Sequence, residues 1–280
     1  MLKIDRELCT GCGACEAICP VQAIKMKHNF EGFYYPEIDE QTCIGCGKCD
    51  KICQIHQENI PTLNRKFYAV YAQDTEERSK SATGGMCACV AKYIIQNGGY
   101  FCGAAFYKGK LEHKLTNDFQ FFDKYMRGSK YFQSSMGTVY AEIQEKLKQN
   151  IPVAFVGTPC QVNGLRLFLG KPYDNLYLID LICHGVPSPK VFDKFTLDNQ
   201  LNDILKKDVS VNFRDKKTGW HTSSFVIKNK KDIFYDRRIH DDPFCKAFLA
   251  DICLRKSCYS CPYTQVNRAS DMMVGDFWGC

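Results

Sequence analysis

The sequence predicts an α+β protein with a small cysteine-rich domain over residues 1–58, followed by a larger α/β domain with a mixed sheet over residues 67–280. Two observations support this division. The first part holds eight cysteines in two runs of one spacing, whereas from residue 67 onward short apolar segments alternate with helical patterns. The intervening segment 57–66 is polar and contains a proline, so we expect it to be a linker.

Both cysteine runs follow the pattern C-x2-C-x2-C-x3-C, and their flanking residues repeat as well. Three cysteines spaced in this way wrap a loop around a 4Fe-4S cluster, and in two-cluster ferredoxins the fourth cysteine of each run binds the other cluster. We therefore predict that Cys53 joins the first run and that Cys19 joins the second. The predicted ligand sets are Cys9, Cys12, Cys15 and Cys53, and Cys43, Cys46, Cys49 and Cys19.

Glycines between the ligands fit this interpretation, since a backbone folded over a cluster needs permissive φ values. They are Gly11, Gly13, Gly45 and Gly47. The alternatives are a zinc site or disulfides, but zinc sites use C-x2-C pairs a dozen or more residues apart. About the first sixty residues resemble bacterial-type two-cluster ferredoxins, except that Gln54 stands where the first run has Pro20.

Composition excludes several classes of protein. The 37 Lys and Arg residues against 31 Asp and Glu residues give a net charge of +6, which is too mild to indicate nucleic-acid binding. Eighteen cysteines behind a start that is not a signal peptide indicate a reducing cytoplasm. No apolar run approaches the ~20 residues of a membrane span.

The larger domain should contain a sheet buried between helix layers, because apolar runs alternate with helices. Strands are expected at 67–72, 100–106, 152–156, 176–183, 209–214 and 224–228, and helices at 86–96, 138–149, from about 161, and at 243–254. The chain stops at D-F-W-G-C, within what the pattern predicts to be an unfinished strand or loop. We therefore expect the natural protein or domain to extend further.

Four further cysteines suggest a second metal site. Cys160 follows one predicted strand, Cys183 ends the next, and Cys258 and Cys261 form a C-x2-C pair. Strand ends of this kind are where α/β sheets place ligands. The four thiolates are predicted to hold a third cluster or a zinc ion; the alternative is that Cys160 and Cys183 are small buried hydrophobic residues.

Six motifs in order resemble the family of coenzyme F420 hydrogenase/dehydrogenase beta subunits over most of residues 67–280. They are S-A-T-G-G, G-S-K-Y-F-Q-S, V-G-T-P-C-Q, L-I-C-H-G-V-P-S-P, F-R-D-K-K-T-G-W and S-C-Y-S-C-P-Y…R-A-S-D-M-M-V-G-D-F-W-G. The resemblance implies a flavin (FAD), a 4Fe-4S cluster beside it, and two-electron exchange with a deazaflavin or another reducible partner. The larger domain would then be the flavin-binding domain, although the family's C-terminal tail is missing here.

Three glycine-containing turns would contact the flavin under this resemblance. A Gly-Gly turn before a helix offers N–H groups for a pyrophosphate, and the other turns add a hydroxyl, a cation and a ring; plain turns are the alternative. We assign the catalytic role to His184 and Lys130, His184 as a proton relay or a hydrogen-bond donor to a cluster sulfur. The predicted flavin-binding residues are Thr83, Gly84, Gly85, Ser129, Lys130, Tyr131, Gly157, Thr158 and Pro159.

The predicted function is that of an iron–sulfur flavoprotein oxidoreductase. Single electrons from a protein donor such as ferredoxin would pass through the clusters to the flavin, which exchanges electron pairs with a small molecule. A first alternative is a non-catalytic electron-transfer subunit of a larger redox complex. A second is an iron–sulfur binding or sensing module.

Overall fold

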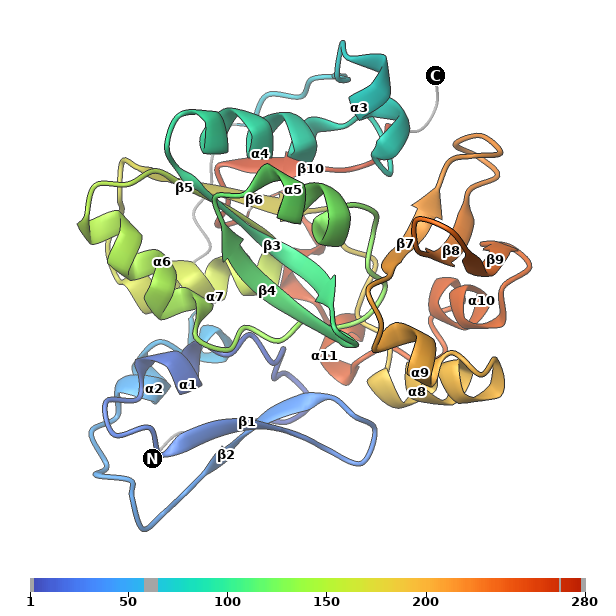
Figure 1. The fold of residues 1–280 in the computed structure, drawn as a ribbon. Helices are drawn as coiled ribbons and strands as arrows, with labels where there is room; N and C mark the ends of the chain where they lie inside the picture. The colour runs from blue at the N-terminus through green and yellow to red at the C-terminus, as the bar shows by residue number, and fades with distance from the viewer. Residues whose placement is uncertain (1–2, 58–64, 267, 278–280) are drawn as a thin grey trace.

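The computed structural model describes residues 3–57, 65–266 and 268–277. Its N-terminal part is a β-hairpin with two short helices beside it (Figure 1). The elements are α1 (Ala14–Ile18), β1 (Ile24–His28), β2 (Tyr34–Ile38), α2 (Lys48–Lys51) and the 3-10 helix η1 (Gln54–His56). The hairpin turn is closed by the Asn29 side chain, whose Oδ1 accepts hydrogen bonds from the N–H groups of Glu31 and Phe33.

The two halves of the cysteine repeat have the same local conformation. Gly13 and Gly47 lie at the N-caps of α1 and α2 with φ values of 78° and 70°. Gly11 and Gly45, just before them, have φ values of 69° and 65°. A side chain is strained in this left-handed region, so the expectation that these four positions need glycine is confirmed.

A five-stranded mixed sheet forms the centre of the larger part, in the order β10-β6-β5-β3-β4. Its strands are β3 (Tyr100–Tyr107), β4 (Lys110–Thr116), β5 (Val153–Gly157), β6 (Leu176–Leu181) and β10 (Met272–Val274). Neighbouring strands are parallel except β3 and β4, which form an antiparallel hairpin. The mixed sheet expected from the sequence is confirmed.

Helices cover both faces of this sheet (Figure 1). α4 (Met86–Gln96), with α5 (Phe119–Phe121) and the π-helical turn η2 (Phe122–Met126), packs on one face. α6 (Val139–Lys148) and α7 (Pro159–Leu169) pack on the other, where Tyr140 and Leu165 meet Phe155 of β5. The N-terminal part lies against this second layer, since α1 contacts both α6 and α7.

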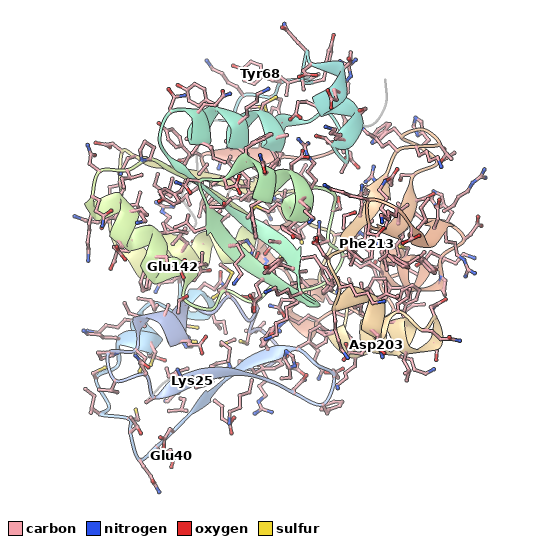
Figure 2. The ribbon with its side chains drawn as sticks, in the orientation of Figure 1. Lys25, Glu40, Tyr68, Glu142, Asp203 and Phe213 are labelled. Atoms are coloured by element: carbon pink, nitrogen blue, oxygen red, sulfur yellow. The ribbon has the colours of Figure 1, made fainter. Side chains whose placement is uncertain are left out.

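A second, antiparallel sheet, β7-β8-β9, packs with α8 and α10 around an aromatic core. Phe213 of this core lies among packed side chains, whereas Tyr68 projects from the surface of the molecule (Figure 2). The remaining elements are α3 (Thr75–Lys80), α8 (Pro189–Asp198), α9 (Asn202–Leu205), β7 (Ser210–Asp215), β8 (Ser224–Lys228), β9 (Ile233–Arg238), α10 (Pro243–Leu249), α11 (Lys256–Tyr259) and the 3-10 helix η3 (Pro262–Thr264).

Some expectations from the sequence were wrong. Residues 67–72 form no strand, and Phe67 and Tyr71 are exposed, because no partner strand reaches this apolar segment. The helix expected over 243–254 ends at Leu249, and Asp251 then adopts a left-handed φ of 58°. Most of the expected linker, residues 58–64, lies outside the described residues. None of the helices in the described ranges is long and apolar enough to cross a membrane.

Candidate metal centres

Four cysteines surround a cavity between the first cysteine run and the end of the second, which we call the first cavity. It has an empty volume of about 400 Å³, part of it open to solvent. Cys9, Cys12, Cys15 and Cys53 line it, together with Thr10, Gly11, Gly13 and Gln54. This is the first predicted ligand set, including the exchanged fourth cysteine.

The second cavity has a similar size and the complementary set of cysteines. Its empty volume is about 390 Å³, and Cys19, Cys43, Cys46 and Cys49 line it with Gly45 and Gly47. The exchange follows from helix geometry: α1 and α2 each separate the third and fourth cysteine of a run by four residues, which is about 6 Å of helix. Each short helix therefore connects one cavity to the other.

Both cavities fit a 4Fe-4S cluster in the chemistry and placement of their walls. Each presents four thiols and two left-handed glycines whose backbone can approach the contents closely. The Cys19 sulfur also accepts a hydrogen bond from the N–H of Ala23 at 3.3 Å. Within the described ranges, no three His, Cys, Asp or Glu side chains lie close enough together to bind a single metal ion.

The first cavity lies against the helices of the larger part of the chain. An added Cβ at Gly164 of α7 would lie 3.2 Å from the Cys12 sulfur. The Tyr140 hydroxyl of α6 lies 2.9 Å from the carbonyl oxygens of both Cys12 and Gln161. Burial raises the pKa of the Cys12 thiol to about 12. The second cavity faces solvent: Cys46 is exposed, and Ile44 beside it is 65% exposed.

The third predicted ligand set gathers beside the N-terminus of α7. Cys160 lies in the first turn of that helix, where its sulfur is 3.2 Å from the Thr158 hydroxyl. Burial and then the thiol of Cys160 raise the pKa of Cys183 to about 12, with smaller contributions from Cys258 and Cys261. The four thiols therefore lie in one region of the molecule, where their charges influence one another.

Polar side chains connect the third set to the first cavity. Gln54, which lines that cavity, donates a hydrogen bond to the Thr10 hydroxyl at 2.6 Å and accepts one from the Tyr263 hydroxyl at 2.5 Å. Asn163 of α7 donates to the same Tyr263 hydroxyl at 2.8 Å. The Thr10 hydroxyl also lowers the pKa of Cys160, against a larger upward effect of burial. Gln54, at which the second cysteine run departs from the first, therefore connects the first cavity to the third set through hydrogen bonds.

In two of the turns predicted to bind the flavin, the chain itself fills the space on the Cβ side of a glycine. A Cβ at Gly84 would lie 2.8 Å from the Val70 carbonyl oxygen, and one at Gly128 would lie 2.3 Å from Asn212 Oδ1. Lys216 donates a hydrogen bond to the Thr83 carbonyl at 2.8 Å. Gly85 caps α4 without any side-chain hydrogen bond to the first turn. Close packing thus accounts for these turns, and the residues do not by themselves outline a flavin cradle.

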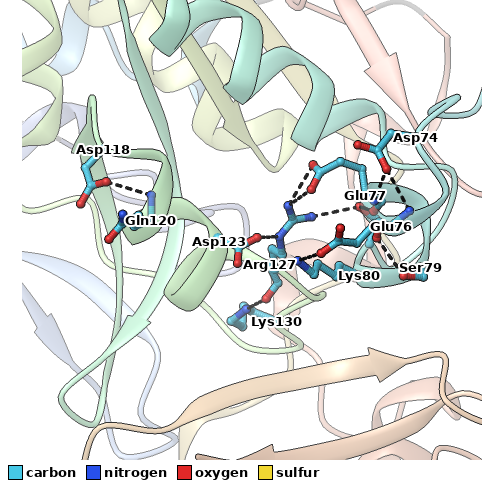
Figure 3. Close-up of polar contacts among 11 residues, drawn as sticks. Asp74, Glu76, Glu77, Ser79, Lys80, Asp118, Gln120, Asp123, Arg127 and Lys130 are labelled. Atoms are coloured by element: carbon cyan, nitrogen blue, oxygen red, sulfur yellow. Dashed lines mark hydrogen bonds and ion pairs between the residues drawn. The ribbon is translucent and has the colours of Figure 1, made fainter. Parts of the chain in front are cut away.

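Lys130 lies beside an ion-pair network in which Arg127 binds Glu77 and Asp123 (Figure 3). Its ammonium group donates to the carbonyl oxygens of Arg127 and Gly128, at 2.5 Å and 2.9 Å. Burial lowers the pKa of Lys130 to about 7.

The other predicted contacts are dispersed around α7 and the aromatic core. Tyr131 packs its ring on Phe213 and Phe248. Ser129 pairs through its carbonyl with the N–H of Phe213. His184 is partly exposed and pairs with Asp251 at 2.8 Å. Gly157, Thr158 and Pro159 lead from β5 into α7 next to Cys160.

Sequence reasoning missed three residues beside the thiols. Gly164 allows α7 to approach Cys12, and a glycine inside a helical pattern was the available signal. Gln133 donates hydrogen bonds to the carbonyl oxygens of Thr10 and Gly11. Arg255 is 1% exposed and binds the Cys9 carbonyl at 2.6 Å. No local pattern identifies the last two, because their partners lie far away in the chain.

Both parts of the chain are similar to known protein families. Residues 8–56 match the 4Fe-4S dicluster domain, and residues 151–279 match the family described as the C terminus of the coenzyme F420 hydrogenase/dehydrogenase beta subunit. The chain is therefore similar to the coenzyme F420 hydrogenase/dehydrogenase beta subunits over its C-terminal part. The resemblance carried by the six motifs is therefore confirmed.

Two further comparisons gave similar proteins. An F(420)H(2) dehydrogenase subunit of Methanosarcina mazei is 27% identical over 97% of this chain and 76% of its own length. A chain of the F420-reducing [NiFe] hydrogenase complex from Methanosarcina barkeri is 16% identical, with a TM-score of 0.41. That alignment covers 64% of this chain and 60% of the solved chain, so this chain spans less than two thirds of that relative.

Proposed function

We propose that this chain is an iron–sulfur electron-transfer subunit of an oxidoreductase, with 4Fe-4S clusters held by the first cavity, the second cavity and the third thiol set. The carrying observation is that each cavity is lined by four cysteines and receives its fourth from the other run. Such clusters supply single-electron transfer when bound. The proposal includes the division of the chain into two domains, residues 1–58 and residues 67–280.

The surroundings of the three sites support an order from the surface inward. The second cavity is exposed through Ile44 and Cys46, which suits contact with a redox protein such as ferredoxin. The first cavity is buried under α7, and the third set lies at the N-terminus of the same helix. α7 therefore lies between the first and third sites, with Gly164 and Asn163 at its contact with the first cavity.

A flavin and a two-electron partner complete the leading form of the proposal. The relative in Methanosarcina mazei is named as a subunit of an F(420)H(2) dehydrogenase, which supports a deazaflavin-like partner for this chain. The helix terminus of α4 has no side-chain cap, so its first N–H groups suit a pyrophosphate. In this form residues 83–85, 129–131 and 157–159 would hold an FAD, and Lys130 and His184 would take the catalytic role, in a reducing cytoplasm.

The second form is an electron-transfer subunit without its own flavin. The packing of Gly84 and Gly128 against the chain's own atoms favours it, as does the engagement of Lys130 with carbonyl oxygens. In this form another subunit of the complex would carry the two-electron chemistry.

Anaerobic purification from the natural host, followed by iron, sulfide and flavin analysis, tests the proposal. We expect about twelve irons per chain, falling by about four when any cysteine of the third set is replaced by serine. Bound FAD supports the first form, and its absence together with full iron supports the second. Stoichiometric zinc without iron would contradict both forms.

A further inference from the structure

Arg255 is a buried cation between two of the thiol sets. It precedes α11 and is the largest of the fully buried side chains in the described ranges. Its N–H binds the Val186 carbonyl at 2.8 Å, which fixes the backbone in place. Its guanidinium extends away from this anchor toward the first cavity, where an added Cβ at Gly11 would lie 3.0 Å from Nη1.

The hydrogen-bond partners of this guanidinium are all neutral. Nε donates to the Cys9 carbonyl at 2.6 Å, Nη2 to the Tyr34 carbonyl at 2.8 Å, and Nη1 to Gln133 Oε1 at 3.2 Å. The rings of Tyr35 and Phe33 lie 4.2 Å and 5.4 Å from its central carbon. Among the described residues, no carboxylate lies within ion-pair distance of Arg255.

A second buried arginine shows how a buried positive charge is usually neutralised. Arg268 is 6% exposed and forms an ion pair with Asp180 at 3.2 Å. A buried charge without a partner is strongly unfavourable, and arginine cannot lose its proton at accessible pH. Arg255 therefore requires a negative charge from a source other than the ionised side chains around it.

The thiol sets on either side can supply that charge. Arg255 binds the backbone of Cys9, which lines the first cavity, and its own carbonyl oxygen accepts a hydrogen bond at 2.8 Å from the N–H of Cys258 in the third set. Iron–sulfur clusters with four thiolates are anionic, and each electron they accept adds one negative charge. Among the described residues, none that lines the second cavity forms a hydrogen bond with Arg255.

We propose that Arg255 is a positioning residue that acts as the shared counter-cation of the first and third clusters and raises the reduction potential of both. This inference rests on the proposed function. The cation stabilises the reduced form more than the oxidised form, because the reduced form is the more negative. It thereby keeps both buried centres reducible despite a low-dielectric setting, which otherwise disfavours added charge.

The test is an anaerobic, EPR-monitored redox titration of the full chain with iron determined in the same samples. Arg255→Gln should make reduction of the first and third clusters at least tenfold less favourable, a shift of about 59 mV or more to lower potential. The second cluster should be unchanged. Arg255→Lys keeps the charge and should shift both potentials less. Arg268→Gln is the matched control, since its charge is already balanced by Asp180, and it should leave all three potentials in place.

Gln133→Glu provides a second route that keeps Arg255 and its packing. The new carboxylate would lie where the amide oxygen now accepts the arginine hydrogen bond, so both potentials should fall. Wild-type protein without iron would overturn the proposed function and this inference with it. Full iron with unchanged potentials in Arg255→Gln or Gln133→Glu would overturn the inference alone, as would equal shifts in the glutamine and lysine variants. If Arg255→Gln does not fold, the Gln133→Glu and Arg255→Lys results decide.

Discussion

The two halves of the cysteine repeat have the same sequence pattern and backbone but opposite surroundings. An added Cβ at Gly11 would lie 2.8 Å from the Tyr34 carbonyl oxygen, whereas one at Gly45 would meet nothing within 4 Å. Their φ values differ by only a few degrees, 69° against 65°. The motif thus determines how each thiol set is formed, while tertiary packing determines which set is internal. Four predictions test this contrast.

Iron release should separate the two halves most clearly. With an anaerobic chelator, we expect a fast phase of about four irons from the second cavity and a slow phase of about eight from the buried sites. Absorbance of the iron–chelator complex follows both phases. Cys46→Ser should abolish the fast phase, and Cys12→Ser should reduce the slow one. Release in a single phase would contradict the contrast.

Alanine substitutions at the matched glycines should differ in cost. Gly45→Ala should cost about 1–2 kcal/mol, because only the left-handed backbone is strained. Gly11→Ala adds overpacking of roughly 1–3 kcal/mol against Tyr34 and Gln133. Thermal unfolding of the iron-loaded variants measures the difference. Equal midpoints would show that the first cavity is less tightly enclosed than its packing indicates.

Acid should destabilise the part of the protein that packs against the first half of the cysteine repeat. Burial lowers the pKa of His113 to about 4, and its ring links the Ser134 hydroxyl to the Val156 carbonyl. Because the unfolded chain takes up this proton near pH 6.5, stability should be lost as the pH falls from 6.5 to 4, by roughly 3 kcal/mol at most. His113→Gln should flatten this part of the pH profile of urea unfolding. An unchanged profile would exclude His113 as its source.

The fourth prediction concerns a pair of substitutions that exchange the residues following the two cysteine runs. Gln54→Pro should cost about 1–3 kcal/mol and weaken the connection to the third set, since it removes the bonds to Thr10 and Tyr263. Pro20→Gln at the exposed equivalent position should cost less than about 1 kcal/mol. Thermal midpoints and EPR coupling between clusters provide the measurements. A larger loss of stability in Pro20→Gln than in Gln54→Pro would contradict the conclusion that the first cavity is the more tightly packed one.

Local patterns predicted the parts of this molecule that depend on local sequence. The helix over 86–96 and the strands at 100–106 and 152–156 were confirmed, since each carries its own periodicity and end signals. The expected strand at 67–72 was wrong because strand formation requires a partner that the pattern does not show. β4 was missed because its alternating polar residues gave no apolar run.

The candidate sites show the same limit. Cysteine spacing led to both four-thiol cavities, and the strand-end argument led to Cys160 and Cys183, whose charges influence one another. Their roles as ligands stay predictions. Arg255 and Gln133 were not identified, because their importance depends on contacts with Cys9, Thr10 and Gly11, more than a hundred residues away.

The attachment of Arg255 to the N-terminal part affects the order in which the protein is made. Phe33 and Tyr35 form a small core with Cys9 and Val186, and Arg255 lies against both rings. Translation exposes Cys9 long before residue 186 or residue 255 emerges from the ribosome. The first half of the repeat therefore cannot complete its core until residue 255 has been synthesised, although domains usually fold from the N-terminus onward. Until Val186 and Arg255 emerge, its thiols remain open to oxidants and to competing metals.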